Sequence, residues 1–451
     1  MAGSEAALQL ARRGFNVRLH EMRPNVQTDV HKTANCAELV CSNSLKSTKP
    51  ESAAGMLKEE LSALGSVVYR AACDNSVAAG GALAVDRERF SSAVTAAVEG
   101  EARIEFVRGE VSSLAQAAEG ADAVVLATGP LTSDALASSL AETIGVGYLA
   151  FYDAAAPIVM ADSLDMTKVF RQSRYEDAID ESGAEQGDYL NAPFTKEEYE
   201  RFAAELVSAE RVIMRDFESK DLFQACQPVE EIARKGIDAP RFGALKPVGL
   251  TDPRTGKRPW AAVQLRAEDA NKTSYNLVGF QTNLKFGEQK RVFRMIPGLE
   301  NAEFARYGVM HRNTFIDAPR LLDENLELET ASEKLGVPVY VAGQLGGTEG
   351  YCEAIRSGLH VALAVAARML GMQAPALPRE TVFGALVGHA TDPETVDYQP
   401  MHVNFGIMPP LPQRVKNKQQ RYAAYAGRGA DALRAYKNAL AQTGLLGGEL
   451  V

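Results

Sequence analysis

Hydrophobic and polar positions at the start of the chain predict a helix followed by a strand. Residues 4–13 form an alanine-rich amphipathic segment with high helix propensity. Gly14 ends this segment, and residues 17–21 are typical of a strand that closes on an acidic residue, Glu21. A glycine that opens a helix, here Gly3, and an acid at a strand end about 20 residues later indicate the back half of a dinucleotide-binding unit.

The front half of such a unit is an apolar strand with two earlier glycines, and these would precede Met1. Two interpretations therefore stay open. Either the chain begins at an internal methionine, or Gly3 is only a packing glycine before a helix. In the first case, amides at the helix N-terminus would approach a pyrophosphate and Glu21 would hold an adenosine ribose.

The order strand, glycine, helix recurs later in the chain. Residues 121–130 are typical of a buried parallel strand that runs into a turn at Thr128 and Gly129, where two-dinucleotide flavoproteins make a second cofactor contact. Residues 337–344 form another apolar strand, followed by a glycine-rich loop at 346–351 and an alanine-rich helix. Each loop is also compatible with a tight turn that binds nothing. Together the three elements favour one cofactor domain made from both ends of the chain.

The middle of the chain has a different pattern. Residues 195–206 begin with a capping box and have helical periodicity, whereas 261–266 and 276–281 alternate like antiparallel strands. We therefore predict an α/β protein with a Rossmann-like, two-dinucleotide-binding flavoprotein fold and an inserted α+β domain. Residues 1–150 and 331–451 would form the two parts of the FAD-binding domain, and 151–330 the insertion.

Composition restricts the class of protein. The 451 residues are 46% hydrophobic and 24% charged, as in a globular protein of two or three domains, and no apolar run is long enough to span a bilayer. No signal peptide precedes the first helix, so we expect a cytoplasmic protein without a membrane partner. The five cysteines form no CxxC pair, which argues against structural zinc, and we expect no metal site. The net charge of −10 excludes a surface that is basic throughout but leaves room for a local basic patch.

One such patch is the tail. Residues 414–437 contain a single acid, Asp431, among tyrosines and seven cations: Arg414, Lys416, Lys418, Arg421, Arg428, Arg434 and Lys437. A solvated basic helix and a face that follows nucleic-acid phosphates are both open interpretations.

Segments from Ala2 to Leu411 together resemble the folate- and FAD-dependent tRNA uracil-5-methyltransferase family. The matching segments include AGSEAALQLARRG, EMRP, AELVCSNSLKS, GGALAVDRERF, ATGPLTS, FYDAAAPIV, YLNAPFTKEEY, FGALKPVGL, AGQLGGTEGY, VNFGIMPPL and the long run VGFQTNLKFGEQKRVFRMIPGLENAEFARYGVMHRNTFIDAP. The family's N-terminal glycine signature begins before Met1, Cys36 replaces a usual aromatic residue, and residues 346–348 and 352–356 vary on the usual pattern.

The resemblance implies methylation of C5 of the T-loop uridine in tRNA. The carbon would come from 5,10-methylenetetrahydrofolate and the electrons from reduced FAD, with NAD(P)H as the reductant. The insertion would lie on the RNA side. Partners would be the T-arm of tRNA and folate, with the oligomeric state open between a monomer and a weak dimer.

Two cysteines match family positions. Uracil C5 is a poor nucleophile until a group adds at C6, and a cysteine thiolate suits that addition because it attacks and leaves readily. We expect Cys226 to be this nucleophile and Cys41 to be a second functional thiol near the flavin, although the roles could be reversed. Either could instead be a small buried hydrophobe, which is our interpretation of Cys73 and Cys352.

The same resemblance places the remaining candidates. The ADP half of FAD would lie at Gly3 and Glu21 with Thr128 and Gly129 nearby. The ribitol and isoalloxazine would lie at Gly343 and Gln344, beside the helix N-terminus at Gly350 and Tyr351, whose ring could stack on a flavin or pterin. Candidates for folate or RNA contacts are His311, Arg312 and Asn313, which could equally form a surface turn. Candidates for tRNA phosphates are Lys285, Lys290, Arg291 and Arg294.

Other functions remain possible from the sequence. The same chemistry could act on a uridine of ribosomal RNA, because one sequence does not identify the RNA loop. The chain could be a flavin-dependent oxidoreductase of a small molecule, with incidental cysteines. It could also bind RNA without catalysis.

Overall fold

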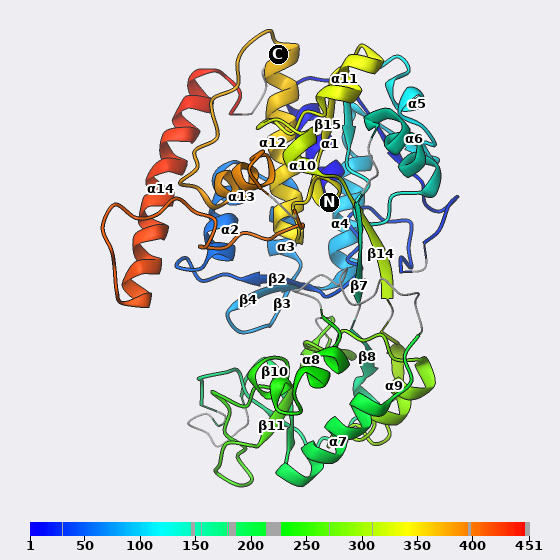
Figure 1. Cartoon of the computed structure of the whole chain (residues 1–451), viewed down its shortest axis with the longest axis vertical. Coiled ribbons are helices and arrows are strands. Elements are labelled where there is room, and N and C mark those ends of the chain that lie inside the picture. Colours follow the sequence, from blue (N-terminus) through cyan, green and yellow to red (C-terminus); the bar gives the residue numbers. More distant parts are fainter. Residues whose placement is uncertain are drawn as a thin grey trace.

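The computed structural model describes residues 1–28, 30–145, 149–154, 156–177, 179, 186–212, 227–269, 271–308, 310–395 and 398–446. Figure 1 shows two lobes: a larger one that contains both ends of the chain and a smaller one made from its middle. Two long antiparallel strands, β7 (Leu149–Ala154) and β14 (Met310–Phe315), run from one lobe towards the other. The chain therefore leaves the larger lobe along β7 and returns to it along β14.

Parallel strands form the centre of the larger lobe. β1 (Val17–Glu21) pairs with β5 (Ile104–Arg108), and β6 (Val124–Leu126) pairs with β15 (Val339–Val341). The second pair joins strands from the two ends of the chain. Burial on both faces favours the apolar composition of β6 and β15. A separate antiparallel sheet contains β2 (Ser44–Ser47), β4 (Ala82–Val85) and β3 (Ser76–Val77).

Helices surround these sheets. Central among them are α1 (Ala2–Arg12) and α12 (Tyr351–Met369), which pack on each other. The other helices of this lobe are α2 (Ala53–Ala63), α3 (Val67–Asp74), α4 (Arg87–Glu99), α5 (Leu114–Ala118), α6 (Asp134–Ile144), α10 (Ala318–Leu321), α11 (Glu329–Leu335), α13 (Val382–Ala390) and α14 (Lys418–Gln442). Asp86 is the N-cap of α4, since its carboxylate accepts a hydrogen bond from the amide of Arg89.

Close approach of α1 to α12 depends on glycine. A Cβ on Gly358 would lie 2.2 Å from the carbonyl oxygen of Ala2, and a Cβ on Gly3 would lie 3.2 Å from the Cβ of Ala127 at the end of β6. Gly343 has φ +78°, and a Cβ there would lie 3.2 Å from that of Ala2. The N-terminus of α1 is thus held against both β6 and α12.

The smaller lobe is built on a six-stranded antiparallel sheet in the order β13 (Phe304–Arg306), β8 (Ile158–Met160), β12 (Ser274–Leu277), β11 (Ala261–Ala267), β10 (Tyr189–Phe194) and β9 (Phe170–Arg171). Its helices are α7 (Lys196–Ser208), α8 (Val229–Lys235) and α9 (Phe286–Phe293). The capping box predicted at residue 195 is confirmed between Thr195 and Glu198. The strand predicted at 276–281 ends earlier, at Leu277, because the chain turns at Gly279 with φ +78°.

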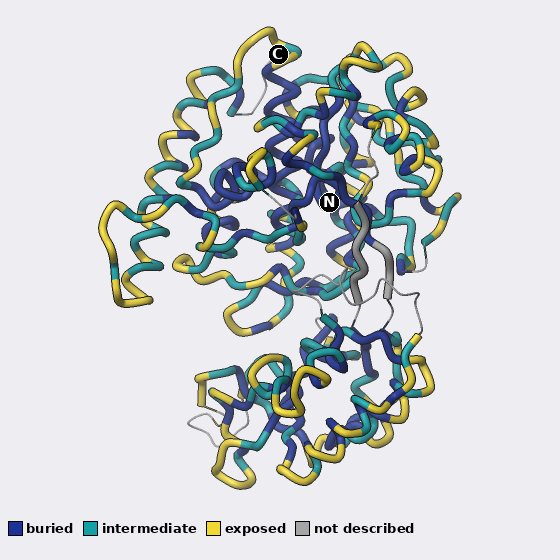
Figure 2. Tube along the Cα trace, viewed as in Figure 1, coloured by how far each residue is buried: buried dark blue, intermediate teal, exposed yellow. Residues whose placement is uncertain are grey.

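Each lobe has its own hydrophobic core, as Figure 2 shows by the buried residues inside each. The core of the smaller lobe extends from Val159 to Ala302 along the chain, and Phe315 to Leu328 already pack in the larger core. A buried ion pair in the larger core joins α2 to α12: Arg356 Nε lies 3.3 Å from Glu60 Oε2, and the guanidinium lies over the Phe383 ring.

Candidate active site in the larger lobe

A cavity of about 1530 Å³ opens in the larger lobe, beyond the ~300–1,000 Å³ of ordinary ligand pockets. Its walls come from β1, β6, the loops that follow them, and the first turns of α1 and α12. Part of the space lies between β1 and β6. Among the described residues, each of these strands pairs with a neighbour on one edge only.

Every described residue that the sequence nominated for a cofactor lines this cavity, and so does Cys41. The nominated residues are Gly3, Glu21, Thr128, Gly129, Gly343, Gln344, Gly350 and Tyr351. They come from five separate stretches of the chain. The fold therefore brings together residues that the sequence related partly by motif spacing and partly by resemblance.

Two helix N-termini face the cavity. Met1, Ala2, Gly3 and Ser4 of α1 line it, as do Gly350 and Tyr351 at the start of α12, where Gly350 has φ +116°. Neither helix has a side-chain cap. Amides at a helix N-terminus lack intrahelical acceptors and favour an anion such as a phosphate.

Two buried amide side chains in the cavity wall have an atom without a hydrogen-bond partner among the described residues. These atoms are Nε2 of Gln344, a donor, and Oδ1 of Asn313, an acceptor. Gln344 is 8% exposed and Asn313 2%. Leaving such groups unpaired costs about 1–3 kcal/mol each. A bound planar heterocycle with donors and acceptors on its edge would satisfy both, which fits a flavin.

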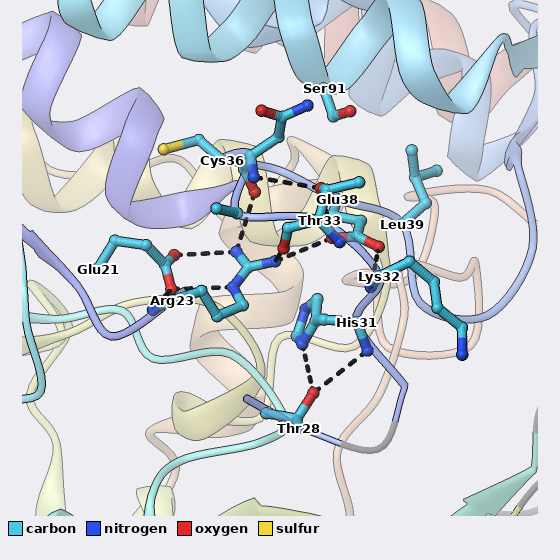
Figure 3. Close-up of polar contacts among 12 residues, drawn as sticks. Glu21, Arg23, Thr28, His31, Lys32, Thr33, Cys36, Glu38, Leu39 and Ser91 are labelled. Carbon is cyan, nitrogen blue, oxygen red and sulfur yellow. Dashed lines mark hydrogen bonds and ion pairs between the residues drawn. The ribbon is translucent and has the colours of Figure 1, made fainter. Parts of the chain in front are cut away.

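The loop after β1 is organised by Arg23, as Figure 3 shows. Its guanidinium donates to both carboxylate oxygens of Glu21, with both distances 2.9 Å, and to Glu38 at 3.0 Å. Glu38 in turn accepts from the amides of Lys32 and Thr33. Burial acts to raise the pKa of Glu21, but the hydrogen bonds and charge of Arg23 outweigh it and leave that pKa below its usual value. Glu21 is therefore an oriented carboxylate at the cavity wall.

Cys41 lies in a loop that three side chains hold. Its amide donates to the hydroxyl of Tyr351 at 3.1 Å, and its carbonyl accepts from Arg87 and Arg306, both at 2.9 Å. Burial raises the pKa of Tyr351, so this phenol stays neutral. The loop is thus fixed relative to the start of α12.

Residues from the smaller lobe take part in this arrangement. Glu268, 5% exposed, forms an ion pair with Arg87, and Arg266 donates to the amide oxygen of Asn43 at 2.8 Å. Asn43 also donates to the carbonyl of Ala267 at 2.9 Å. These contacts join the base of the smaller lobe to the loop that contains Cys41. Arg87, Glu268 and Arg306 were not among the site residues predicted from the sequence, although the matching segments contain Arg87 and Arg306.

The other cysteines differ in their surroundings. Cys226, the expected uracil nucleophile, lies outside the described residues. Cys352 is buried, and burial raises its pKa to about 12, in accord with a structural role. Cys36 is also buried and lines the cavity, and burial raises its pKa. Cys73 is exposed on α3.

Most of the cations in the insertion that were predicted to contact tRNA phosphates have partners within the protein. Lys285 pairs with Glu210 at 2.7 Å, Arg291 pairs with Glu205 and Glu288, and Arg294 donates to the carbonyl of Ala302. The side chains of His311 and Arg312 are not described.

No group of three or more described His, Cys, Asp or Glu residues is arranged to hold a metal. Within the described ranges, no helix has the length and apolar character needed to cross a membrane.

Comparison with known proteins identifies the class of protein to which this chain belongs. The family model described as "Glucose inhibited division protein A" matches residues 1–373. Two crystal forms of Aquifex aeolicus GidA superpose with TM-scores of 0.65 and 0.68, at 16% identity, over 97% of this chain and 72% and 74% of theirs. The predicted α/β fold of the dinucleotide-binding flavoprotein class is confirmed.

Curated relatives identify the family within this class. Proteins named "Methylenetetrahydrofolate--tRNA-(uracil-5-)-methyltransferase TrmFO" from Symbiobacterium thermophilum and Moorella thermoacetica are both 50% identical, over 97% and 95% of this chain and 95% and 94% of theirs. That from Bacillus subtilis is 47% identical over 96% of both chains. The chain belongs to the TrmFO family, as the sequence motifs predicted.

Proposed function

We propose that this protein methylates C5 of the T-loop uridine of tRNA, with 5,10-methylenetetrahydrofolate as the one-carbon donor, FAD as the cofactor and NAD(P)H as the reductant. One observation carries the proposal beyond the names of the relatives. A single large cavity gathers Cys41, Asn313 and the eight nominated cofactor residues, and the buried amides of Asn313 and of Gln344, one of the eight, each have an atom without a partner among the described residues.

The residues present fit FAD. The first turn of α1 and Gly3 would hold the pyrophosphate, and Glu21, oriented by Arg23, would accept from ribose hydroxyls. Gln344 and Asn313 would bond the polar edge of the isoalloxazine. Bound FAD, once reduced, supplies the electrons that turn a one-carbon unit at the methylene level into a methyl group.

The protein's own chemistry is thiolate addition. A cysteine thiolate that adds to C6 of uracil breaks the C5–C6 double bond and makes C5 nucleophilic. After the carbon has been transferred, loss of the C5 proton and elimination of the thiolate restore the ring. We assign the attacking thiolate to Cys226 and a second role beside the flavin to Cys41. The exchange of these two roles is the alternative.

The test uses the purified chain with an unmodified tRNA transcript, labelled 5,10-methylenetetrahydrofolate and NADPH or NADH. We expect flavin absorption bands in the visible spectrum and ribothymidine in the T-loop. Cys226→Ala and Cys41→Ala should each abolish labelling, whereas Cys73→Ala, on the exposed surface of α3, should retain it.

Other outcomes would redirect the assignment. Label in a ribosomal RNA uridine but none in tRNA would change the substrate. Oxidation of NAD(P)H with a small molecule and no RNA labelling would indicate an oxidoreductase. A colourless protein would overturn the FAD mechanism.

A further inference from the structure

A second concave site, with a volume of about 440 Å³, lies at the start of α14, on the side of the larger lobe shown at left in Figure 1. It is lined by Pro410, Leu411, Gln413, Arg414, Val415, Lys416, Arg421 and Tyr425. We call it the basic pocket. Three of its lining residues are cations and none is acidic.

The charge of the basic pocket is not neutralised within the described chain. Arg414, Lys416 and Arg421 have no carboxylate partner among the described residues, and the sequence has no acid between Asp397 and Asp431. By contrast, Arg434 further along α14 pairs with Asp431 at 3.2 Å. Although the chain has a net charge of −10, this concave surface is locally positive and favours a polyanion.

Packing contacts and a hydrogen bond hold the residues around the basic pocket in place. The Phe405 ring packs at a tilt on Tyr422 and stacks on Tyr425, with ring centroids 4.4 and 5.3 Å apart, and the cations of Lys418 and Arg421 lie over the Tyr422 ring. Arg428 donates to the carbonyl of Pro410 at 2.9 Å. These contacts hold the segment before α14 against the helix, so the cations have a fixed support.

The basic pocket is connected to the active-site cavity by one short segment. His402 lines the cavity, and the neighbouring Met401 and Val403 are hydrogen-bonded to the loop before α12 and to Glu353. Pro410, eight residues after His402, lines the basic pocket. An extended chain of that length spans at most about 29 Å, so the basic pocket begins no farther than that from His402 at the cavity wall.

We infer that the basic pocket binds backbone phosphates of the tRNA substrate and so contributes to docking of the T-arm. This inference rests on the proposed function. The amides at the N-terminus of α14 add partial positive charge at the same place. Such contacts carry no sequence information, because phosphates position the RNA while bases specify it.

The test compares two double variants of the full-length protein, each lacking two positive charges. K416A/R421A removes cations of the basic pocket, and R434A/K437A removes cations about 140–160° around the same helix from Arg421. We expect K416A/R421A to weaken binding of an unmodified tRNA transcript about tenfold near physiological salt and to reduce the salt slope by about 1.5–2. R434A/K437A should bind like the unmodified protein.

Folding and tRNA binding are measured separately. Both variants should keep the flavin spectrum and the melting temperature, and K416R/R421K should restore binding. Equal tRNA affinity in K416A/R421A and R434A/K437A, with an unmodified protein that methylates tRNA, would overturn the basic pocket and leave the proposed function intact. An unmodified protein that neither binds nor methylates tRNA would overturn both.

Discussion

The amide of Cys41 donates a hydrogen bond to the hydroxyl of Tyr351, 310 residues further along the chain, with 3.1 Å between nitrogen and oxygen. This bond joins the loop after β1 to the first residue of α12 at the wall of the cavity. Because Arg87 and Arg306 hold the carbonyl of the same residue, the backbone of Cys41 is fixed from both sides. A thiol that must meet a flavin or a uracil benefits from such restraint.

The first prediction concerns this bond. Tyr351→Phe keeps the ring but removes the acceptor, so the partly buried Cys41 amide loses its partner at a cost of about 1–2 kcal/mol. We expect flavin to be retained, methylation to fall, and Cys41 to react several-fold faster with a thiol reagent, as measured by peptide mass spectrometry. Tyr199→Phe is the control, because its hydroxyl bonds the carbonyl of Ile237 in the other lobe. An unchanged reaction rate in Tyr351→Phe would show that the bond does not restrain the thiol.

A second prediction tests the contact between α1 and α12. Gly358→Ala places a methyl group 2.2 Å from the Ala2 carbonyl, so the helices must separate, at a cost of about 1–3 kcal/mol. Flavin should be lost on gel filtration because the first turn of α1 moves. Gly427→Ala in α14 is the control. No described atom outside the neighbouring helix backbone lies within 4 Å of a Cβ at that position, and alanine there should stabilise by about 0.5–1 kcal/mol. Full flavin retention in Gly358→Ala would contradict the proposed role of the α1 N-terminus.

The third prediction concerns a substitution that should raise the stability of the flavin-free protein and lower its affinity for flavin. Gln344→Leu removes a buried amide nitrogen that has no partner in the described part of the chain, so the flavin-free protein should become more stable by about 1 kcal/mol while flavin affinity falls. Gln289→Leu is the matched change. The Gln289 amide donates to the carbonyls of Leu284 and Gly308 and accepts from the Gly308 amide, so its loss should destabilise. Calorimetry of both proteins without flavin, followed by flavin titration, gives the comparison. A Gln344→Leu protein that is less stable yet binds flavin normally would refute the assignment.

Local features of this fold follow from sequence patterns, whereas the partners of its site do not. Helix periodicity and the capping box located α1 and α7, and the apolar run 121–130 contains the parallel strand β6. The glycine turn at Gly279 shortened β12 because one left-handed residue outweighed the alternation around it. Motif spacing related Gly3 to Glu21, whereas resemblance supplied the roles of Gly343 and Gln344, since no spacing relates Gly3 to Gln344.

Ion pairs and hydrogen bonds between side chains far apart in the sequence could not be predicted. Arg87 and Glu268 are 181 residues apart, and neither belongs to a motif that specifies an ion pair. Arg23 was visible only as part of EMRP, and its bonds to Glu21 and Glu38 depend on how the following loop folds back. Charged side chains find partners through tertiary geometry, which periodicity does not encode.

The last prediction concerns pH. Glu230 at the start of α8 is fully buried and accepts from the Thr282 hydroxyl at 3.0 Å and the Asn283 amide at 2.6 Å. Burial raises its pKa from 4.5 to about 7 despite those bonds. The folded state therefore holds the proton more tightly than the unfolded state. The resulting stability is fully present below about pH 4.5 and is lost as the pH rises through about 7.

The size of this effect, about 3–4 kcal/mol, follows from the shift and about 1.4 kcal/mol per pKa unit. Thermal unfolding between pH 5 and pH 8 should show the melting temperature of the smaller lobe falling with pH, and Glu230→Gln should remove most of that slope because its amide is neutral throughout. Glu231→Gln is the control: its carboxylate pairs with Arg211 at the surface of the same helix, and the slope should persist. If Glu230→Gln kept the full slope, the pH dependence would have to arise from other groups, and Glu230 would be charged in the folded protein at neutral pH.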